Sequence, residues 1–254
     1  MPQSSPASVA AFLTWIAGFV DAVGFISLAH IYTANMSGNS IAIGIQAVLE
    51  NWPEVLRRLC PVLAYLVGLI FCRLLIEFGA RQRVRSIACV AFLCEIGLLV
   101  PAFAGHAETG RTASALTFVY VALLATAMGI QNAALTHFGS LMLHTGFVTG
   151  TLVKLAEQAA KYLTWAFDQI RAPGATIRSM LAASRGQKSF RLTVWLSLLW
   201  VAYVAGACCG ALADNRWKLK ALLIPIVCLA STAVLDVFHP LAIAEEAGQS
   251  KLSS

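Results

Sequence analysis

Charged side chains are scarce in this sequence. Only 12% of its 254 residues are Asp, Glu, Lys or Arg, whereas soluble domains carry roughly 25%. Hydrophobic residues make up 59% of the chain, and its mean hydropathy is +0.76. Apolar runs of about 20 residues, the length that crosses a bilayer as a helix, recur along the chain, and no stretch between them could form a soluble domain. The composition excludes a soluble globular protein and predicts a single integral membrane domain over residues 1–254.

The sequence also lacks the motifs of common catalytic sites. It contains no HExxH, no GxSxG, no glycine-lysine phosphate loop and no cluster of His and Asp. Its seven cysteines lie in or at the ends of apolar runs, and none forms a CxxC pair, so we expect them to be small packing residues. We therefore expect no enzymatic activity, no metal and no cofactor. The net charge of +6 is typical of basic loops beside a membrane and predicts no nucleic-acid partner.

Six apolar runs are candidates for spanning helices, and they predict an all-α, polytopic membrane helix bundle. These runs cover residues 9–31, 60–78, 86–105, 114–138, 192–213 and 221–238. Two further segments begin with small polar residues, and each is expected to form a short helix. One of them, residues 37–49, is too short to span a bilayer by itself.

A faint internal repeat relates residues 9–105 to residues 114–238. The matches keep the same order in both halves: GFVDA at 18–22 with GIQNA at 129–133, YTANMSGN at 32–39 with HTGFVTGT at 144–151, and AYLVG at 64–68 with AYVAG at 202–206. If the short helix of each half does not cross, each half crosses three times and the repeat is inverted, as in many secondary transporters. If the short helix does cross, each half crosses four times and the repeat is parallel.

The two polar segments resemble helix starts. Ser37, Asn39, Thr149 and Thr151 are candidate cap residues. The glycines between them, Gly38 and Gly150, allow close approach of another backbone or of a ligand. Two helix starts facing one another near the middle of the bilayer would form a site for an anion or a polar group. The alternative is that both are ordinary capped loops at the membrane surface.

Polar residues within the apolar runs are candidates for function because their burial in a bilayer is costly. Asp21 and Glu95 are candidate ion- or proton-coupling residues, and the alternative is that they fix helix packing through hydrogen bonds. The predicted substrate-binding set combines the helix starts with the polar residues of the fourth run: Asn35, Ser37, Gly38, Asn39, Gln131, Asn132, Thr145, Thr149, Gly150 and Thr151.

The motifs GFVDAVGF, NMSGN, GIQNA and TGFVTGTL together resemble those of the YoaK-like family of bacterial multi-pass membrane proteins, a domain of unknown function. The resemblance runs from about residue 9 to residue 238. Ser37 stands where the family usually has threonine, and this keeps the hydroxyl. The resemblance implies a multi-pass protein of the bacterial inner membrane and names no substrate.

Three functional hypotheses remain open. The first is a secondary transporter or channel for a small polar or anionic solute or ion, with its site between the two repeat halves. The second is an accessory or scaffold protein that acts through the basic segment 168–191, which we expect to lie on the anionic inner leaflet. An intramembrane enzyme is the third. The lipid bilayer is a partner under each hypothesis, and a homo-oligomer stays open.

The distribution of basic residues predicts the orientation. With six crossings, ten Lys and Arg residues lie on the side of the second and fourth loops and six lie on the other side. Because basic loops stay in the cytoplasm, both termini and segment 168–191 are predicted to be cytoplasmic.

This orientation can be tested by thiol labelling. Single cysteines at Ser179 and Ser253, in a background without native cysteines, should both resist a membrane-impermeant thiol reagent in intact cells and react after the cells are permeabilised. Labelling of either position in intact cells contradicts the six-crossing arrangement.

Overall fold

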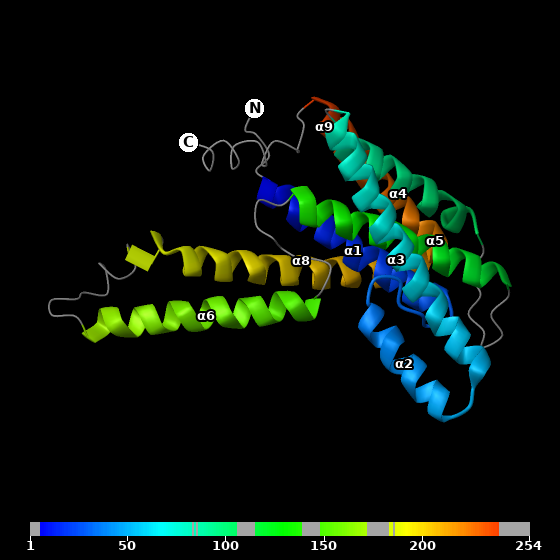
Figure 1. Cartoon of the computed structure of the whole chain (residues 1–254), viewed down its shortest axis with the longest axis horizontal. Helices are drawn as coiled ribbons and strands as arrows, with labels where there is room; N and C mark the ends of the chain where they lie inside the picture. Colours follow the sequence, from blue (N-terminus) through cyan, green and yellow to red (C-terminus); the bar gives the residue numbers. More distant parts are fainter. Residues whose placement is uncertain are drawn as a thin grey trace.

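Long α-helices packed side by side make up the structure (Figure 1). The computed structural model describes residues 6–82, 84, 86–105, 115–138, 148–171, 183–184 and 186–238. In chain order the elements are α1 (Pro6–Ser27), α2 (Met36–Val48), α3 (Trp52–Arg81), α4 (Ile87–Ala104), α5 (Ala115–Phe138), α6 (Val148–Arg171), α8 (Lys188–Trp217), the 3-10 helix η1 (Lys218–Leu222) and α9 (Leu223–Phe238).

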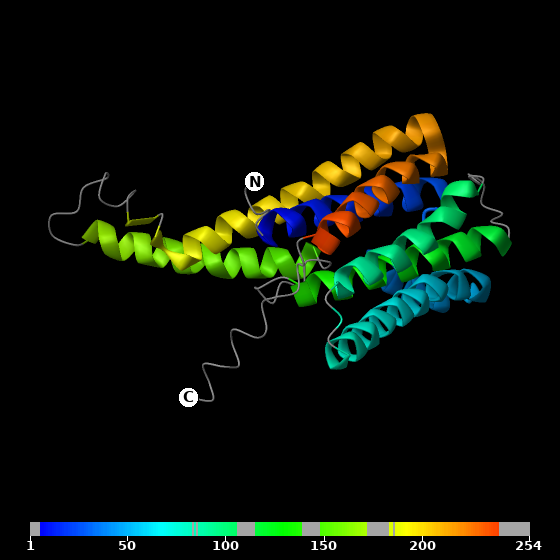
Figure 2. The same ribbon diagram turned by 90° about the horizontal axis from the view of Figure 1, so that it is seen from above.

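Five segments of the described chain are long and apolar enough to cross a membrane. They are Ser8–Ser27, Trp52–Arg81, Ile87–Ala104, Ala115–Leu135 and Lys188–Phe238. The last contains both α8 and α9, which follow one another through η1 without a break in helical structure. At η1 the chain turns back, so that α9 runs against the direction of α8 (Figure 2). The predicted class, an all-α polytopic membrane bundle, is confirmed.

Large apolar side chains also cover much of the outer surface. On α3, Leu63 is 52% exposed and Val67 is 60% exposed, and on α8 Val201 is 52% exposed. Contiguous apolar surface of this kind is rare on soluble monomers. It is the surface that a lipid-facing helix bundle presents.

The closest helix packing is between α1 and α8, whose backbones touch through glycine. A Cβ atom added to Gly206 would lie 2.0 Å from the carbonyl oxygen of Trp15, and one added to Gly18 would lie 2.1 Å from that of Tyr203. Real Cβ atoms do not come so near another heavy atom, so only glycine permits this approach. Small residues at such contacts are how helices gain packing energy in lipid, where apolar burial gives little.

The same kind of contact joins α3 to α5. A Cβ atom on Gly68 would lie 2.2 Å from the carbonyl oxygen of Thr126, and one on Gly129 would lie 2.3 Å from that of Tyr65. The α1–α8 and α3–α5 pairs are the two most extensive helix contacts in the described chain. Helices α4 and α9 pack against each other, and α4 also packs along α5.

The two helices with polar starts differ in length. α2 has 13 residues, as expected, but α6 has 24, so the prediction of two short helices is wrong for the second. α2 stops because the chain turns at Glu50, where φ is 54°, and α3 then begins with Pro53 in its first turn. The sequence of α6 contains no such turn and no proline. Strong helix formers continue after Thr151, including a Glu157–Lys161 pair one turn apart.

α6 lies along the first half of α8, and the two extend beyond the other helices (Figures 1 and 2). The ring of Tyr162 contacts that of Phe190, with centroids 5.1 Å apart. The basic segment 168–191 is thus helical at both ends, which corrects its description as a loop. Residues 172–182 and 185 of this segment lie outside the described residues.

Glycine contacts should control stability. Gly206→Ala is expected to destabilise the protein by about 1–3 kcal/mol, because the new methyl group forces α1 and α8 apart. Gly97→Ala is the matched control, since nothing lies within 4 Å of a Cβ atom at Gly97 on α4. Thermal unfolding of the detergent-purified variants measures both. Equal melting temperatures for the two variants would contradict the close α1–α8 contact.

Candidate functional site

Asp21 is the most heavily hydrogen-bonded carboxylate among the described residues. It lies on α1 with 4% of its surface exposed. Its Oδ1 accepts hydrogen bonds from the backbone N–H of Thr33 at 2.8 Å, from the Thr33 hydroxyl at 3.1 Å and from the backbone N–H of Ala34 at 2.8 Å. Its Oδ2 accepts one from the Tyr203 hydroxyl at 2.9 Å. Asp21 therefore ties α1 both to the segment before α2 and to α8.

These bonds bring the start of α2 back along α1. The chain reverses after α1 through Ala29 and His30, whose φ angles are 55° and 57°. The guanidinium of Arg58 donates to the carbonyl oxygen of His30 at 2.8 Å and holds this turn against α3. Asp21 precedes the last residue of α1 by six positions, which is about 9 Å along a helix. α2 therefore starts alongside the last turns of α1, and it packs against α3.

The predicted residues at the start of α2 divide between exposed and buried positions. Asn35 is the N-cap but makes no capping bond, so Ser37 and Asn39 lie inside the helix and the prediction that they cap it is wrong. Ser37 is exposed, and its hydroxyl donates to Oδ1 of the exposed Asn35. Gly38 leaves room for the Tyr32 ring, which an added Cβ would approach to 2.9 Å. Asn39 is fully buried.

A carboxylate lies beside this predicted anion site. The unpaired N–H groups at a helix start attract negative charge. Here the Asp21 carboxylate bonds the amides of Thr33 and Ala34, which precede the N-cap Asn35. A negative charge from within the chain therefore lies just ahead of α2, without a bond to the N–H groups of the helix itself.

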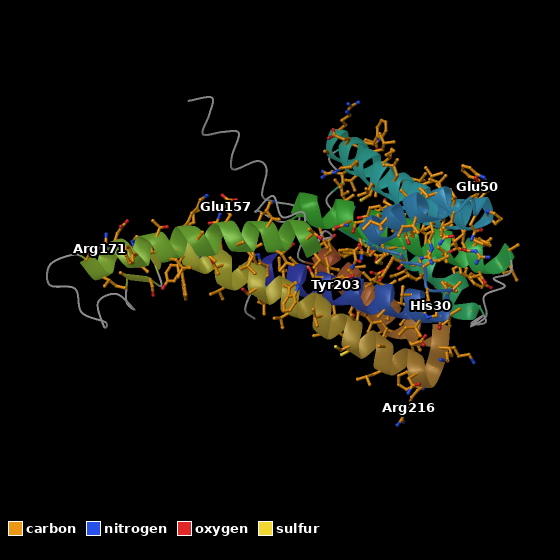
Figure 3. The ribbon with its side chains drawn as sticks, turned by 90° about the horizontal axis from the view of Figure 1, so that it is seen from below. His30, Glu50, Glu157, Arg171, Tyr203 and Arg216 are labelled. Atoms are coloured by element: carbon orange, nitrogen blue, oxygen red, sulfur yellow. The ribbon has the colours of Figure 1, made fainter. Side chains whose placement is uncertain are left out.

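A second polar pair joins α3 to α5. The Asn132 side chain donates through Nδ2 to the hydroxyl of Tyr65, and both residues are buried. The Asp21 carboxylate lies within electrostatic range of Tyr65. We call Asp21, Thr33, Tyr203, Tyr65 and Asn132 the central polar cluster. Figure 3 labels Tyr203 on α8, where that helix passes α1.

Sequence reasoning selected Asp21 and Asn132 but missed the two tyrosines as site residues. A signal was present, because Tyr65 and Tyr203 occupy the same position in the matched motifs AYLVG and AYVAG. Thr33 was missed as well, although it opens the polar segment TANMSGNS.

Two buried amide oxygens remain without a partner within the described chain. Asn39 donates through Nδ2 to the carbonyl oxygen of Tyr32 at 2.8 Å, and its Oδ1 accepts nothing. Gln131 donates through Nε2 to the carbonyl oxygen of Leu13 at 3.0 Å, and its Oε1 likewise accepts nothing. Because each donor is fixed by its bond, each free atom is an acceptor. Buried acceptors without partners favour a bound group that donates hydrogen bonds.

The second polar helix start is only partly described. Thr149 is exposed, Gly150 is half-buried and Thr151 is buried, while Thr145 lies outside the described residues. The start of α6 does not meet that of α2, since α2 packs only against α3 and α6 only against α8 in the described chain. The expectation that the two starts approach one another is therefore wrong. Each is held by the long helix of its own half.

Glu95 lies apart from the central polar cluster. It is on α4 and is fully buried, and neither carboxylate oxygen has a hydrogen-bond partner among the described residues. Asp21 and Glu95, predicted to share one role, thus occupy opposite environments.

Comparison with known proteins places these residues in a wider group. Residues 9–235 match the family described as "Protein of unknown function (DUF1275)". The UPF0700 transmembrane protein YoaK of Bacillus subtilis (strain 168) is 26% identical over 212 residues, which cover 83% of this chain and 85% of that protein. No solved structure matches the chain.

Two substitutions test whether the Asp21 carboxylate holds the segment before α2. Asp21→Ala leaves the amides of Thr33 and Ala34 without an acceptor, which should cost about 1–3 kcal/mol for each buried donor. The hydrogen exchange of these two amides, read by mass spectrometry or NMR, should then accelerate. Asp21→Asn retains one oxygen in place and should protect both amides. Tyr203→Phe is the control, because it removes only the bond to Oδ2. Unchanged exchange in Asp21→Ala would show that the carboxylate does not hold this segment.

Proposed function

The chain belongs to the DUF1275 family of transmembrane proteins, and on that basis we propose that it is a secondary transporter or channel for a small polar solute. In this proposal six helices cross the inner membrane and both termini are cytoplasmic. The solute site lies between two inverted halves, around the central polar cluster. The chain carries out no chemical conversion.

The proposal of two related halves is supported by recurring contacts. The sequence match pairs Gly18 with Gly129 and Tyr65 with Tyr203. Gly18 packs on the carbonyl group of Tyr203, and Gly129 packs on that of Tyr65. The α1–α8 contact is thus repeated, residue for matched residue, between α5 and α3.

The direction of the helices supports inversion. α1 and α5, which open the two halves, run in opposite directions, and so do α4 and α9, which close them (Figures 1 and 2). An odd number of crossings in each half produces this relation. Inverted repeats of this kind are the usual architecture of secondary transporters, with the solute near the midplane between the repeats.

The polar contacts cross from one half to the other. Asp21 of the first half bonds Tyr203 of the second, and Asn132 of the second half bonds Tyr65 of the first. Polar residues inside a membrane are costly and mark pathways through it. The observation that carries the proposal is this cluster between the halves, together with the unpartnered acceptor oxygens of Asn39 and Gln131.

The free acceptors refine the chemical class of solute. Oxygen acceptors bind donors such as amines, hydroxyls or ammonium groups, whereas an anion would need donors. Because both free atoms are acceptors and the Asp21 carboxylate lies just ahead of α2, we propose a neutral or cationic solute with hydrogen-bond donors in place of an anionic one.

A second candidate function rests on α6. This helix carries exposed apolar residues, Leu163, Phe167 and Ile170, beside exposed charged ones, Lys161 and Arg171. It extends past the other helices, and Figure 3 labels Glu157 near its middle and Arg171 at its far end. An accessory protein that docks a partner or the membrane surface through α6 would use this face.

Uptake by proteoliposomes tests the transport proposal. Purified protein in liposomes should accumulate at least one member of a labelled panel of small amines, neutral amino acids and sugars. Asn39→Leu should reduce that uptake at least 10-fold, because it removes the free acceptor while keeping the side-chain size. Ser40→Ala on the same helix is the control, since Ser40 is exposed and bonds only the carbonyl oxygen of Met36.

Full uptake by Asn39→Leu would show that the free oxygen of Asn39 does not bind the solute. No uptake of any solute by the wild type, together with partner capture that is lost when the exposed apolar face of α6 is made polar, would favour the accessory function.

A further inference from the structure

The buried carboxylates of this protein fall into two groups. Asp21 accepts four hydrogen bonds. Asp214 accepts one from the Ser27 hydroxyl at 2.5 Å and lies 3.5 Å from the ammonium group of Lys218. Asp236 accepts the backbone N–H of Cys89 at 2.9 Å. Glu95 is the exception within the described residues, because both of its oxygens lack a hydrogen-bond partner although none of its surface is exposed.

The surroundings of Glu95 are apolar. It lies at the middle of α4, between Phe92 and Leu99, which are also fully buried. α4 packs against α3, α5, α9 and η1. The charged or titratable side chains of these elements in the described chain include Cys72 and Arg73 on α3, Tyr120 on α5, Cys228 and Asp236 on α9, and Lys218 and Lys220 on η1, with Cys94 next to Glu95 on α4 itself.

None of these groups compensates a negative charge at Glu95. Cys72 is the one whose thiol interacts with Glu95 electrostatically, and a thiol carries no positive charge in either protonation state. Tyr120 lies against Gly105 at the end of α4, Asp236 is bonded to Cys89, and Lys218 pairs with Asp214. Glu95 makes no hydrogen bond or ion pair with Arg73, Lys220 or any other described residue, so its surroundings provide neither a paired cation nor a hydrogen-bond donor.

An ionised carboxylate without a partner is very costly in such a place, and the group takes up a proton instead. In the arrangement seen here Glu95 is therefore a neutral acid. It can lose its proton only when the helices around α4 separate enough to admit water. Its charge state is thus tied to the arrangement of the helices.

We propose that Glu95 is the proton-binding site that couples transport to the proton gradient. This inference rests on the proposed transport function. On the side where the bundle opens, the O–H bond of Glu95 breaks and its proton passes to water. Water in the opening keeps the carboxylate hydrated until the bundle opens to the opposite side, where the carboxylate takes a proton from water, so one proton crosses for each cycle.

The assignment differs from the sequence-based expectation that Asp21 and Glu95 are equivalent. Asp21 has donors on both oxygens, and protonating it would break the bonds that hold the start of α2. Glu95 has no such bonds to lose. A carboxyl group that gains and loses a proton in each cycle requires this freedom.

Infrared spectroscopy tests the proton site without knowledge of the solute. Purified protein in lipid should show the C=O band of a protonated carboxylic acid at neutral pH, and the band should shift in D2O as the proton exchanges. Glu95→Gln should remove the band, since glutamine has the shape of the neutral acid and should preserve the fold. Asp236→Asn should retain the band, and Glu95→Asp should shift it.

Three infrared results would overturn the proposal. They are no protonated carboxyl band in the wild type, a band that persists in Glu95→Gln, and a band that never exchanges in D2O while the protein stays folded. The last would identify Glu95 as a sealed structural acid.

Proteoliposomes test the coupling itself. With labelled solute from the panel above, an imposed pH gradient should drive accumulation by the wild type. Glu95→Gln should lose this accumulation at least 10-fold yet retain exchange of solute across the membrane without a gradient. Accumulation that is equal in the two proteins would overturn proton coupling at Glu95 and leave the transport function intact. Absence of all flux, with the infrared band present, would refute the proposed function and with it the coupling.

Discussion

The carboxylate of Asp21 organises the first half of this protein. A negative charge inside an apolar bundle is stable only where donors surround it, and Asp21 obtains them from two backbone amides and two hydroxyls. To supply the amides, the chain after α1 must fold back along that helix through two residues with positive φ. To supply the second hydroxyl, Tyr203 must face α1. The starting point of α2 and the orientation of α8 both depend on this one group.

Backbone contact at glycine provides the second constraint. Since lipid tails compete equally for apolar side chains, helices in a membrane gain most from close approach. Gly18 and Gly206 allow it between α1 and α8, and Gly68 and Gly129 allow it between α3 and α5. The hydroxyls of Tyr203 and Tyr65 lie beside these contacts and make the polar bonds between the same helices. Close packing and polar pairing thus occur at the same two helix crossings.

The buried polar groups differ in what they leave free, and that difference points to function. Asp21 has its donors within the chain, and these bonds hold the segment before α2 and helix α8 against α1. Asn39 and Gln131 each keep one free acceptor, and Glu95 has two unpaired oxygens in apolar surroundings. Groups that a folded protein leaves unsatisfied are the ones available to a solute or a proton. The transport and coupling proposals both follow from these unpaired atoms.

Much of the architecture is predictable from the sequence, because it depends on local composition. The apolar runs predict membrane helices, and the polar-headed segment 37–49 predicts the short α2. The matched motifs pair Asp21 with Asn132 and one tyrosine with the other. The length of α6 was also readable, since its sequence contains no helix-stopping turn.

The tertiary structure alone decided which polar residues have partners. Asp21 and Glu95 look alike in the sequence, as single carboxylates in apolar runs, yet one receives four donors and the other none. The starts of α2 and α6 look alike too, and they do not meet. Hydrogen-bond partners are contributed by segments 12 to 182 residues away along the chain, as Thr33 and Tyr203 are for Asp21. Local sequence determines which groups need a partner, and only the packing of distant helices determines which of them receive one.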